Sequence, residues 1–157
     1  MDIRNVAFRF RALLLCSLLI GVDVYGSRVT KILPLGRRLF VDACSASIPF
    51  GRVSLVVSPL RYTGKTCVGS YRLKVFPYFL KNEKGTLVLD ASDGLMKTLM
   101  SGSPVGLAGK ATSNKNGKVK AIVGKAIPET NQKGKVTFSI NSEFGLIVFN
   151  TTYHFGD

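Results

Sequence analysis

Residues 67–79 read CVGSYRLKVFPYF, the longest run of the chain in which apolar and polar side chains alternate. Counting from Cys67, every second residue up to Val75 falls on one face, and that face is apolar. Arg72 and Lys74 fall on the opposite face. A period of two with one apolar face is typical of a β-strand that packs one side on a core and leaves the other side in water. This stretch therefore predicts an all-β fold.

Pro77 marks the end of that run, because proline has no N–H group to donate to a strand ladder. Residues 82–85 (NEKG) predict a turn, and the Asn-Gly pair within 113–117 predicts a hairpin. Shorter alternations predict further strands over 28–33, 37–44, 52–58, 86–91, 105–112, 118–127, 135–141 and 145–155. Leu146 and Val148, on the second face of the last of these strands, predict burial on both sides at its start. The whole pattern favours an antiparallel β-sandwich or a closed β-barrel of about eight or nine short strands.

One short helix interrupts the strands near residues 93–101. Leu95 and Leu99 are four residues apart and fall on one helical face. Ser92, or the aspartate that follows it, is placed to cap the free N–H groups of the first turn. Gly102 is placed to end the helix.

Residues 1–26 contain, in sequence, the segments that are typical of an export signal. Arg4, Arg9 and Arg11 precede an apolar run of signal-peptide length over 12–22, and Gly26 supplies the small residue before a cleavage site. The run is too short for a transmembrane helix, although a signal anchor and a first element of the fold remain as alternatives. Cleavage near Gly26 would leave a single domain of residues 27–157, secreted, periplasmic or held at the cell envelope.

The chain is strongly basic, with 22 Lys and Arg against 9 Asp and Glu and a formal net charge of +13. A field of this sign attracts polyanions and other anionic components of a cell envelope. The lysines concentrate in and after the expected hairpin, where we expect an anion-binding surface of Lys110, Lys115, Lys118, Lys120, Lys125, Lys133 and Lys135.

Lys118 and Lys120 share one strand face, opposite Val119, Ala121 and Val123, so the lysines are expected to form an outward row. The row could bind phosphate or sulfate groups. Alternatively, it could protect a sheet edge from pairing with another chain. The hairpin carries no aromatic side chain on which bases would stack, which argues against nucleic acid as the partner.

Cys44 and Cys67 are the two cysteines outside the apparent signal. In an oxidising compartment they have one possible pairing, and a disulfide between them is the favoured expectation. The alternative is two buried free thiols. Their spacing matches no zinc or redox motif, so neither a metal nor a redox role is expected.

A second hypothesis is a barrel that carries an apolar small molecule among Tyr71, Phe138, Phe149 and Tyr153. Such a carrier should contain a cavity of about 300 Å³ or more. A packed interior would exclude it.

A third hypothesis is a hydrolase with a pair of carboxylates. It requires two of Asp42, Glu83, Asp90 and Glu143 to converge in one cleft. The chain has no nucleophile elbow and no phosphate-binding loop, and its single histidine, His154, is expected at the surface. The sequence thus favours a binding or structural protein without catalytic residues, metal or cofactor.

Overall fold

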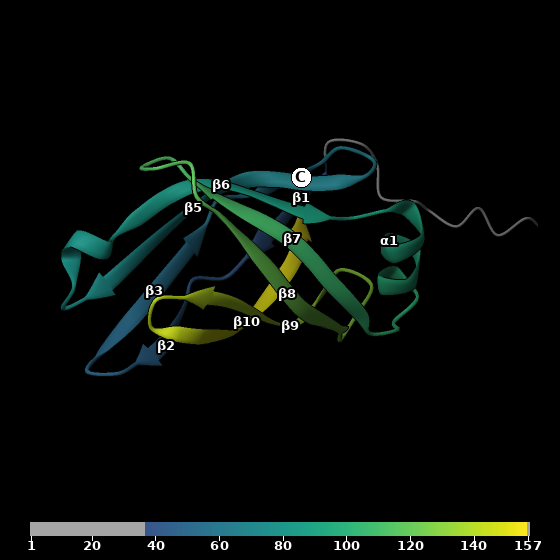
Figure 1. Cartoon of the computed structure of the whole chain (residues 1–157). Helices are drawn as coiled ribbons and strands as arrows, with labels where there is room; N and C mark the ends of the chain where they lie inside the picture. The colour runs from purple at the N-terminus through teal and green to yellow at the C-terminus, as the bar shows by residue number, and fades with distance from the viewer. Residues whose placement is uncertain (1–36, 157) are drawn as a thin grey trace, which may run out of the picture.

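The structure, a computed structural model, describes residues 37–156. The export signal and the expected strand over 28–33 lie outside the described residues. The elements follow one another along the chain as β1 (Arg38–Val41), β2 (Cys44–Ile48), β3 (Gly51–Val57), β4 (Leu60–Tyr62), β5 (Thr66–Phe76), the 3₁₀ turn η1 (Phe79–Lys81), β6 (Glu83–Asp90), α1 (Asp93–Met100), β7 (Val105–Ser113), β8 (Val119–Pro128), β9 (Lys133–Ser142) and β10 (Gly145–Gly156) (Figure 1).

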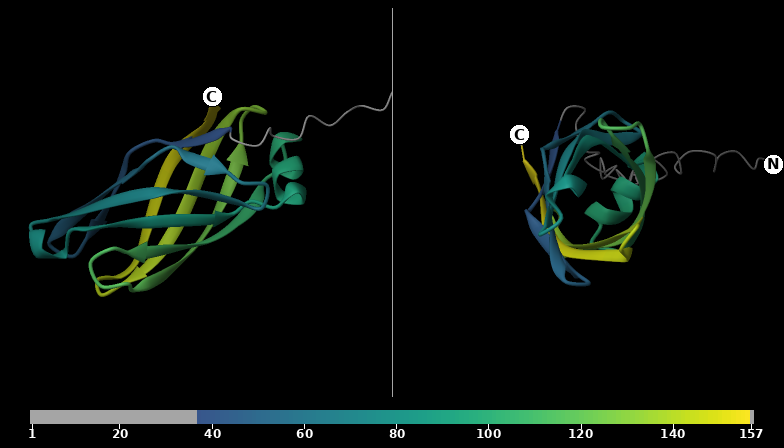
Figure 2. Two further views of the ribbon diagram at one scale, coloured as in Figure 1. Left: turned by 90° about the horizontal axis from the view of Figure 1, so that it is seen from above. Right: turned by 60° about the vertical axis from the view of Figure 1, so that its left-hand side comes forward.

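These strands form one closed antiparallel barrel. The strand order is β2-β3-β5-β4-β1-β10-β9-β8-β7-β6, and pairing of β5 with β6 closes the ring. β3 and β4 pair with successive parts of the same edge of β5, so they act as one interrupted strand. β1 pairs with β4 and β2 pairs with β3, so β1 and β2 also act as one interrupted strand. Eight strands therefore surround the interior, as the view along the barrel shows (Figure 2). This confirms the expected all-β fold and decides for the barrel over the sandwich.

The stretch 67–79, from which the all-β fold was predicted, forms strand β5 as far as Phe76, with the expected buried and exposed faces. The side chains of Cys67, Tyr71 and Val75 are buried in the barrel, and Arg72 and Lys74 are exposed. β5 ends at Phe76, directly before Pro77.

The core lies inside the barrel and continues under α1. The rings of Phe138 and Phe149, from neighbouring strands, stack at 5.3 Å between centroids. The helix α1 covers one end of the barrel (Figure 2), and its side chains Met96 and Leu99 are buried. The Ser92 side chain accepts a hydrogen bond from the Leu95 N–H at 3.3 Å, which confirms the expected helix and its cap.

The hairpin of β7 and β8 forms as expected, but β8 presents the opposite face to the core. Val119 and Val123 are exposed, whereas Ile122 is buried and Lys120 lies on the inner side. The reason lies at Gly124, where an added Cβ would be 2.8 Å from the Cβ of Phe138. Only the face that has glycine at this position fits beside Phe138.

Two other expectations are wrong at residue level. Leu146 and Val148 were expected to be buried on the second face of their strand, yet both are exposed, because nothing in the described part of the chain covers the outer wall. The expected turn at 82–85 is also displaced, since β6 already begins at Glu83.

The expected disulfide between Cys44 and Cys67 does not form, and both thiols are free. Strand pairing aligns Cys44 with Leu55 and, through it, with Leu73 on β5. Cys67 is six residues from Leu73 on that strand, a separation of about 20 Å. A disulfide tolerates only about 7 Å between Cα atoms.

One part of the barrel wall is not joined by a strand ladder. β1 pairs with residues 153–156 of β10, and the Asp42 N–H donates to the Thr152 carbonyl at 3.0 Å. Beyond that point β2 runs beside β10, and among the described pairings β2 bonds only to β3. We call this line between β2 and residues 145–151 the seam.

Candidate binding site in the barrel mouth

The end of the barrel opposite α1 is hollow. This barrel mouth has a volume of about 520 Å³, and its floor is made by inward-facing apolar side chains of four strands, among them Val53, Val75, Ile140, Ile147 and Phe149. Its rim comes from η1 and from the turns that join β7 to β8 and β9 to β10. The barrel mouth is therefore apolar below and polar above.

A three-membered polar network lies on the inner wall. Lys120 Nζ is 2.8 Å from Glu83 Oε2, and the Tyr71 hydroxyl donates to the other carboxylate oxygen. The Glu83 and Lys120 side chains are 15% and 28% exposed. Gly85 makes room for the network, since a Cβ there would lie 2.8 Å from the Tyr71 ring.

Burial and charge act in opposite directions on Glu83. Burial alone raises the pKa of its carboxyl group, but the hydrogen bonds from Lys120 and Tyr71 and the nearby lysine charges outweigh it, so the pKa is lowered. The pKa of the Tyr71 hydroxyl is raised, first by burial and then by its bond to Glu83. The network thus holds an ionised carboxylate beside a neutral phenol.

The rim carries further charge. Lys81 Nζ pairs with Glu143 Oε2 at 2.7 Å, and Lys115 Nζ donates to the Leu80 carbonyl at 3.0 Å. Four lysines and two glutamates line the barrel mouth, and each glutamate is already paired with a lysine. The excess of positive charge favours an anionic group at the rim.

A second hollow, the basic groove, lies on the outer side of this rim. It has a volume of about 450 Å³, and its cations are Arg72, Lys74, Lys84 and Lys115. Arg72 and Lys84 are direct partners in the pairing of β5 with β6. Of this set, sequence reasoning expected only Lys115 at an anion-binding surface and missed Arg72, Lys74 and Lys84, although the polar face of residues 67–79 already contained two of them.

The structure brings only part of the expected lysine surface together. Lys115, Lys118 and Lys120 line the barrel mouth, two of them at its rim and Lys120 on its inner wall, which overturns the expected outward row of Lys118 and Lys120. The remaining four are exposed elsewhere on the wall or its loops: Lys110, Lys125, Lys133 and Lys135.

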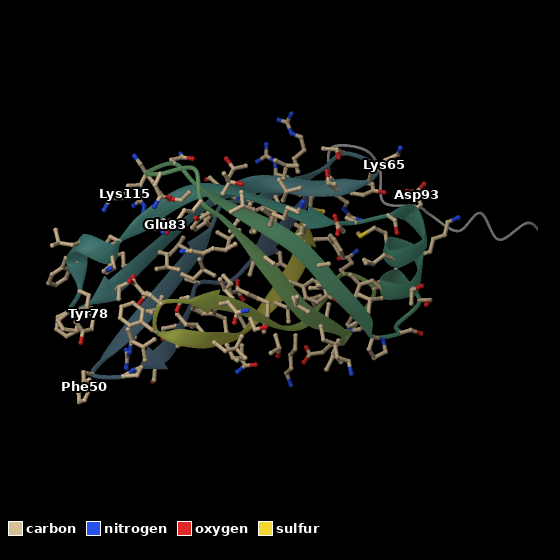
Figure 3. All side chains as sticks on the ribbon, viewed as in Figure 1. Phe50, Lys65, Tyr78, Glu83, Asp93 and Lys115 are labelled. Atoms are coloured by element: carbon tan, nitrogen blue, oxygen red, sulfur yellow. The ribbon has the colours of Figure 1, made fainter. Side chains whose placement is uncertain are left out.

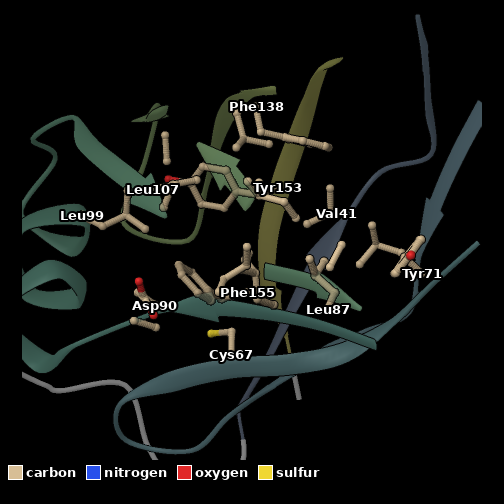
Figure 4. A pocket seen from close by; sticks show the side chains of 18 of the residues that line it. Val41, Cys67, Tyr71, Leu87, Asp90, Leu99, Leu107, Phe138, Tyr153 and Phe155 are labelled. Carbon is tan, nitrogen blue, oxygen red and sulfur yellow. The ribbon is translucent and has the colours of Figure 1, made fainter. Parts of the chain in front are cut away.

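A smaller, apolar inner cavity of about 70 Å³ lies between the barrel mouth and α1 (Figure 4). Tyr71 and Ala111 line both hollows and separate them. Tyr153 is buried, and its hydroxyl has no hydrogen-bond partner among the described residues. Burial, followed by the charge of Glu129, raises the pKa of Tyr153 to about 12.

The residues of the carrier hypothesis all face the interior: Tyr71, Phe138, Phe149 and Tyr153. The inner cavity is nevertheless smaller than a carrier requires, and the larger hollow is the barrel mouth. Of the carboxylates in the hydrolase hypothesis, Glu83 and Glu143 share the barrel mouth. Asp42 instead accepts a hydrogen bond from Thr152 on the wall, and Asp90 lines the inner cavity.

No protein-family model, curated protein or solved structure matches the chain. Within residues 37–156, no cluster of His, Cys, Asp or Glu has the composition of a metal site. In the same range, no helix has the length and apolar character needed to cross a membrane. The function is therefore argued from the barrel mouth itself.

Proposed function

We propose that this protein is a non-enzymatic binding protein whose barrel mouth takes a small amphipathic anion. The ligand has an apolar body and one carboxylate, sulfonate or phosphate group. One observation carries the proposal: a hollow of about 520 Å³ combines an apolar floor with four lysines at its wall and rim. Hollows of this size, with a few convergent polar groups, are typical of small-molecule sites.

The charge arrangement supports binding over hydrolysis. A general acid needs a pKa raised towards the working pH, whereas Lys120 and Tyr71 lower the pKa of Glu83. The other carboxylate of the barrel mouth, Glu143, forms an ion pair with Lys81 at 2.7 Å. Both glutamates are therefore paired with lysines, and Lys115 and Lys118 supply the positive charge that is left for an incoming anion.

The proposal includes an exported location. Residues 1–26 have the order of an export signal, and an exported binding protein would meet amphipathic anions outside the cytoplasm. Any envelope polyanion would contact the exposed basic groove of Arg72, Lys74 and Lys84 rather than the interior.

The test is titration of the full chain with anilinonaphthalene sulfonate, an apolar fluorophore with one sulfonate, followed by displacement with dodecanoate. The double variant Lys115→Ala/Lys118→Ala should bind the fluorophore about fivefold more weakly, because two rim cations are lost. The matched control Lys125→Ala/Lys133→Ala loses the same charge from the wall and should bind as the parent does.

Equal weakening in both double variants would mean that the fluorophore responds to net charge alone, and the proposal would fail. Failure of dodecanoate to displace the fluorophore would also count against it. Near-ultraviolet circular dichroism of each variant verifies that the fluorescence does not come from a loosened core.

A further inference from the structure

Four large apolar side chains project from the mouth end of the barrel. Phe50, Phe76, Phe79 and Leu80 are 92%, 62%, 63% and 86% exposed, and we call them the apolar tip. Phe50 belongs to the turn between β2 and β3 (Figure 3). The others belong to the end of β5 and to η1.

The two loops that carry the apolar tip are in contact. A Cβ added at Gly51 would lie 2.1 Å from the Phe76 carbonyl oxygen, so the first loop rests directly on the second. The rings of Phe76 and Phe79 meet edge to face at 5.7 Å between centroids. Phe76 and Phe79 therefore form one aromatic pair beside the turn of Phe50, and Leu80 lies at the rim of the barrel mouth.

The fold itself gives no reason for an aromatic side chain at Phe50. Its φ of 59° lies in the left-handed region, which favours glycine or asparagine. Its side chain is almost fully exposed and so gains little from burial within the chain. A strained, exposed aromatic residue in a turn points to contact with something outside the molecule.

Cations accompany the apolar tip. Arg52 is the strand partner of Phe76, Lys74 is its second neighbour along β5, and Lys81 follows Leu80. The acidic residue on the neighbouring rim, Glu143, is ion-paired with Lys81. Apolar side chains flanked by lysine and arginine are the combination that anionic lipid surfaces bind, through burial in the interface and attraction to the headgroups.

We propose that the apolar tip docks this protein on an anionic lipid bilayer, with the barrel mouth facing the membrane. The shape favours a bilayer, because two protruding loop ends can sink among lipid headgroups, whereas a protein interface is usually a broader surface. The inference goes beyond ligand binding and involves residues outside the floor of the barrel mouth.

The chain contains no tryptophan, which allows a site-specific test. Phe50→Trp in the full chain places a single indole at the apolar tip, and Val123→Trp places one on the exposed outer wall as the matched control. Each is mixed with vesicles of equal parts phosphatidylglycerol and brominated phosphatidylcholine. We expect about twofold quenching of the tip indole and little change in the wall indole.

Two further variants measure the contribution of the apolar tip to vesicle binding. Phe50→Ser/Phe79→Ser should bind the anionic vesicles about tenfold more weakly than the parent, since two aromatic groups no longer enter the interface. Val123→Ser/Ile127→Ser removes exposed apolar groups from the wall, away from the rim, and should bind as the parent does. Vesicles of phosphatidylcholine alone should bind more weakly than anionic ones.

Equal quenching at both positions, or binding independent of phosphatidylglycerol, would overturn the inference. If lipid does not quench the tip indole and the parent self-associates in a way that Phe50→Ser/Phe79→Ser abolishes, the partner of the apolar tip is a second copy of the chain and not a bilayer. Because anilinonaphthalene sulfonate binding is measured without lipid, a failure of docking is distinguishable from a failure of the proposed ligand site.

Discussion

At Tyr153 the barrel buries a hydroxyl that has no partner among the described residues. A buried polar group left unpaired destabilises the folded state by about 1–3 kcal/mol. We therefore expect Tyr153→Phe to raise the free energy of unfolding by about 1 kcal/mol in urea titration. Tyr71→Phe is the matched control and should lower that free energy, because Tyr71 donates to Glu83. Destabilisation by Tyr153→Phe would mean that its hydroxyl is hydrogen-bonded in solution.

The ion pair of Lys120 with Glu83 should matter more than any surface pair. Removing the cation leaves a largely buried carboxylate, so Lys120→Met should lower the free energy of unfolding at neutral pH by about 2 kcal/mol. Lys135→Met breaks the exposed ion pair with Glu129, at 3.4 Å, and should change the free energy of unfolding by less than about 0.5 kcal/mol. Equal effects of the two substitutions in urea titration would show that burial does not strengthen the inner pair.

The same network predicts a dependence of stability on pH. The pKa of Glu83 is lower in the folded chain than its ordinary value of 4.5, so its stabilising contribution is complete above about pH 4.5. That contribution is lost as the pH falls through the folded pKa. Glu83→Gln should reduce this acid-side loss, and urea titrations across the acid range measure it. If Glu83→Gln loses as much stability at acid pH as the parent does, the loss comes from other carboxylates.

At the scale of single elements, β8 shows that one close contact can decide which face of a strand points inward. Both of its faces are apolar in part, and glycine decides between them. Gly124→Ala places a Cβ 2.4 Å from the Thr137 carbonyl oxygen, so we expect a loss of about 2 kcal/mol in the free energy of unfolding. Gly106→Ala, on the paired strand, meets nothing within 4 Å and should be nearly neutral. A neutral Gly124→Ala would indicate that the barrel wall relaxes.

Local sequence patterns predicted the structure correctly where residues close in sequence determine it. The alternation over residues 67–79 predicted β5, and the serine before residues 93–101 predicted the cap of α1. They were not sufficient for β8, because its inward face is chosen by Phe138 from another strand. Glu83 could have been placed in a strand from its phase with Gly85 and Leu87. The candidate site as a whole required closure of the barrel, which joins residues far apart in sequence.

On the scale of the whole molecule, charge opposes folding. The formal net charge of +13 makes the compact state repel itself, and added salt screens that repulsion. Urea titration should give a higher midpoint at about 0.15 M sodium chloride than at about 0.01 M. Lys84→Gln should reduce this salt-dependent rise in the urea midpoint, since it removes a cation beside Arg72. A midpoint that falls with salt would mean that ion pairs outweigh the repulsion.

Because of the seam, we expect some parts of the barrel wall to open more often than others. β9 is held by ladders on both edges, whereas the described pairings hold β2 only through β3. The hairpin of β2 and β3 can therefore bend outward as one unit without breaking a ladder to β10. Amide protons along β2 should exchange with solvent long before those of β9. We therefore expect the barrel to open first on the side that carries Phe50, which would give a molecule held at the apolar tip a short path into the interior.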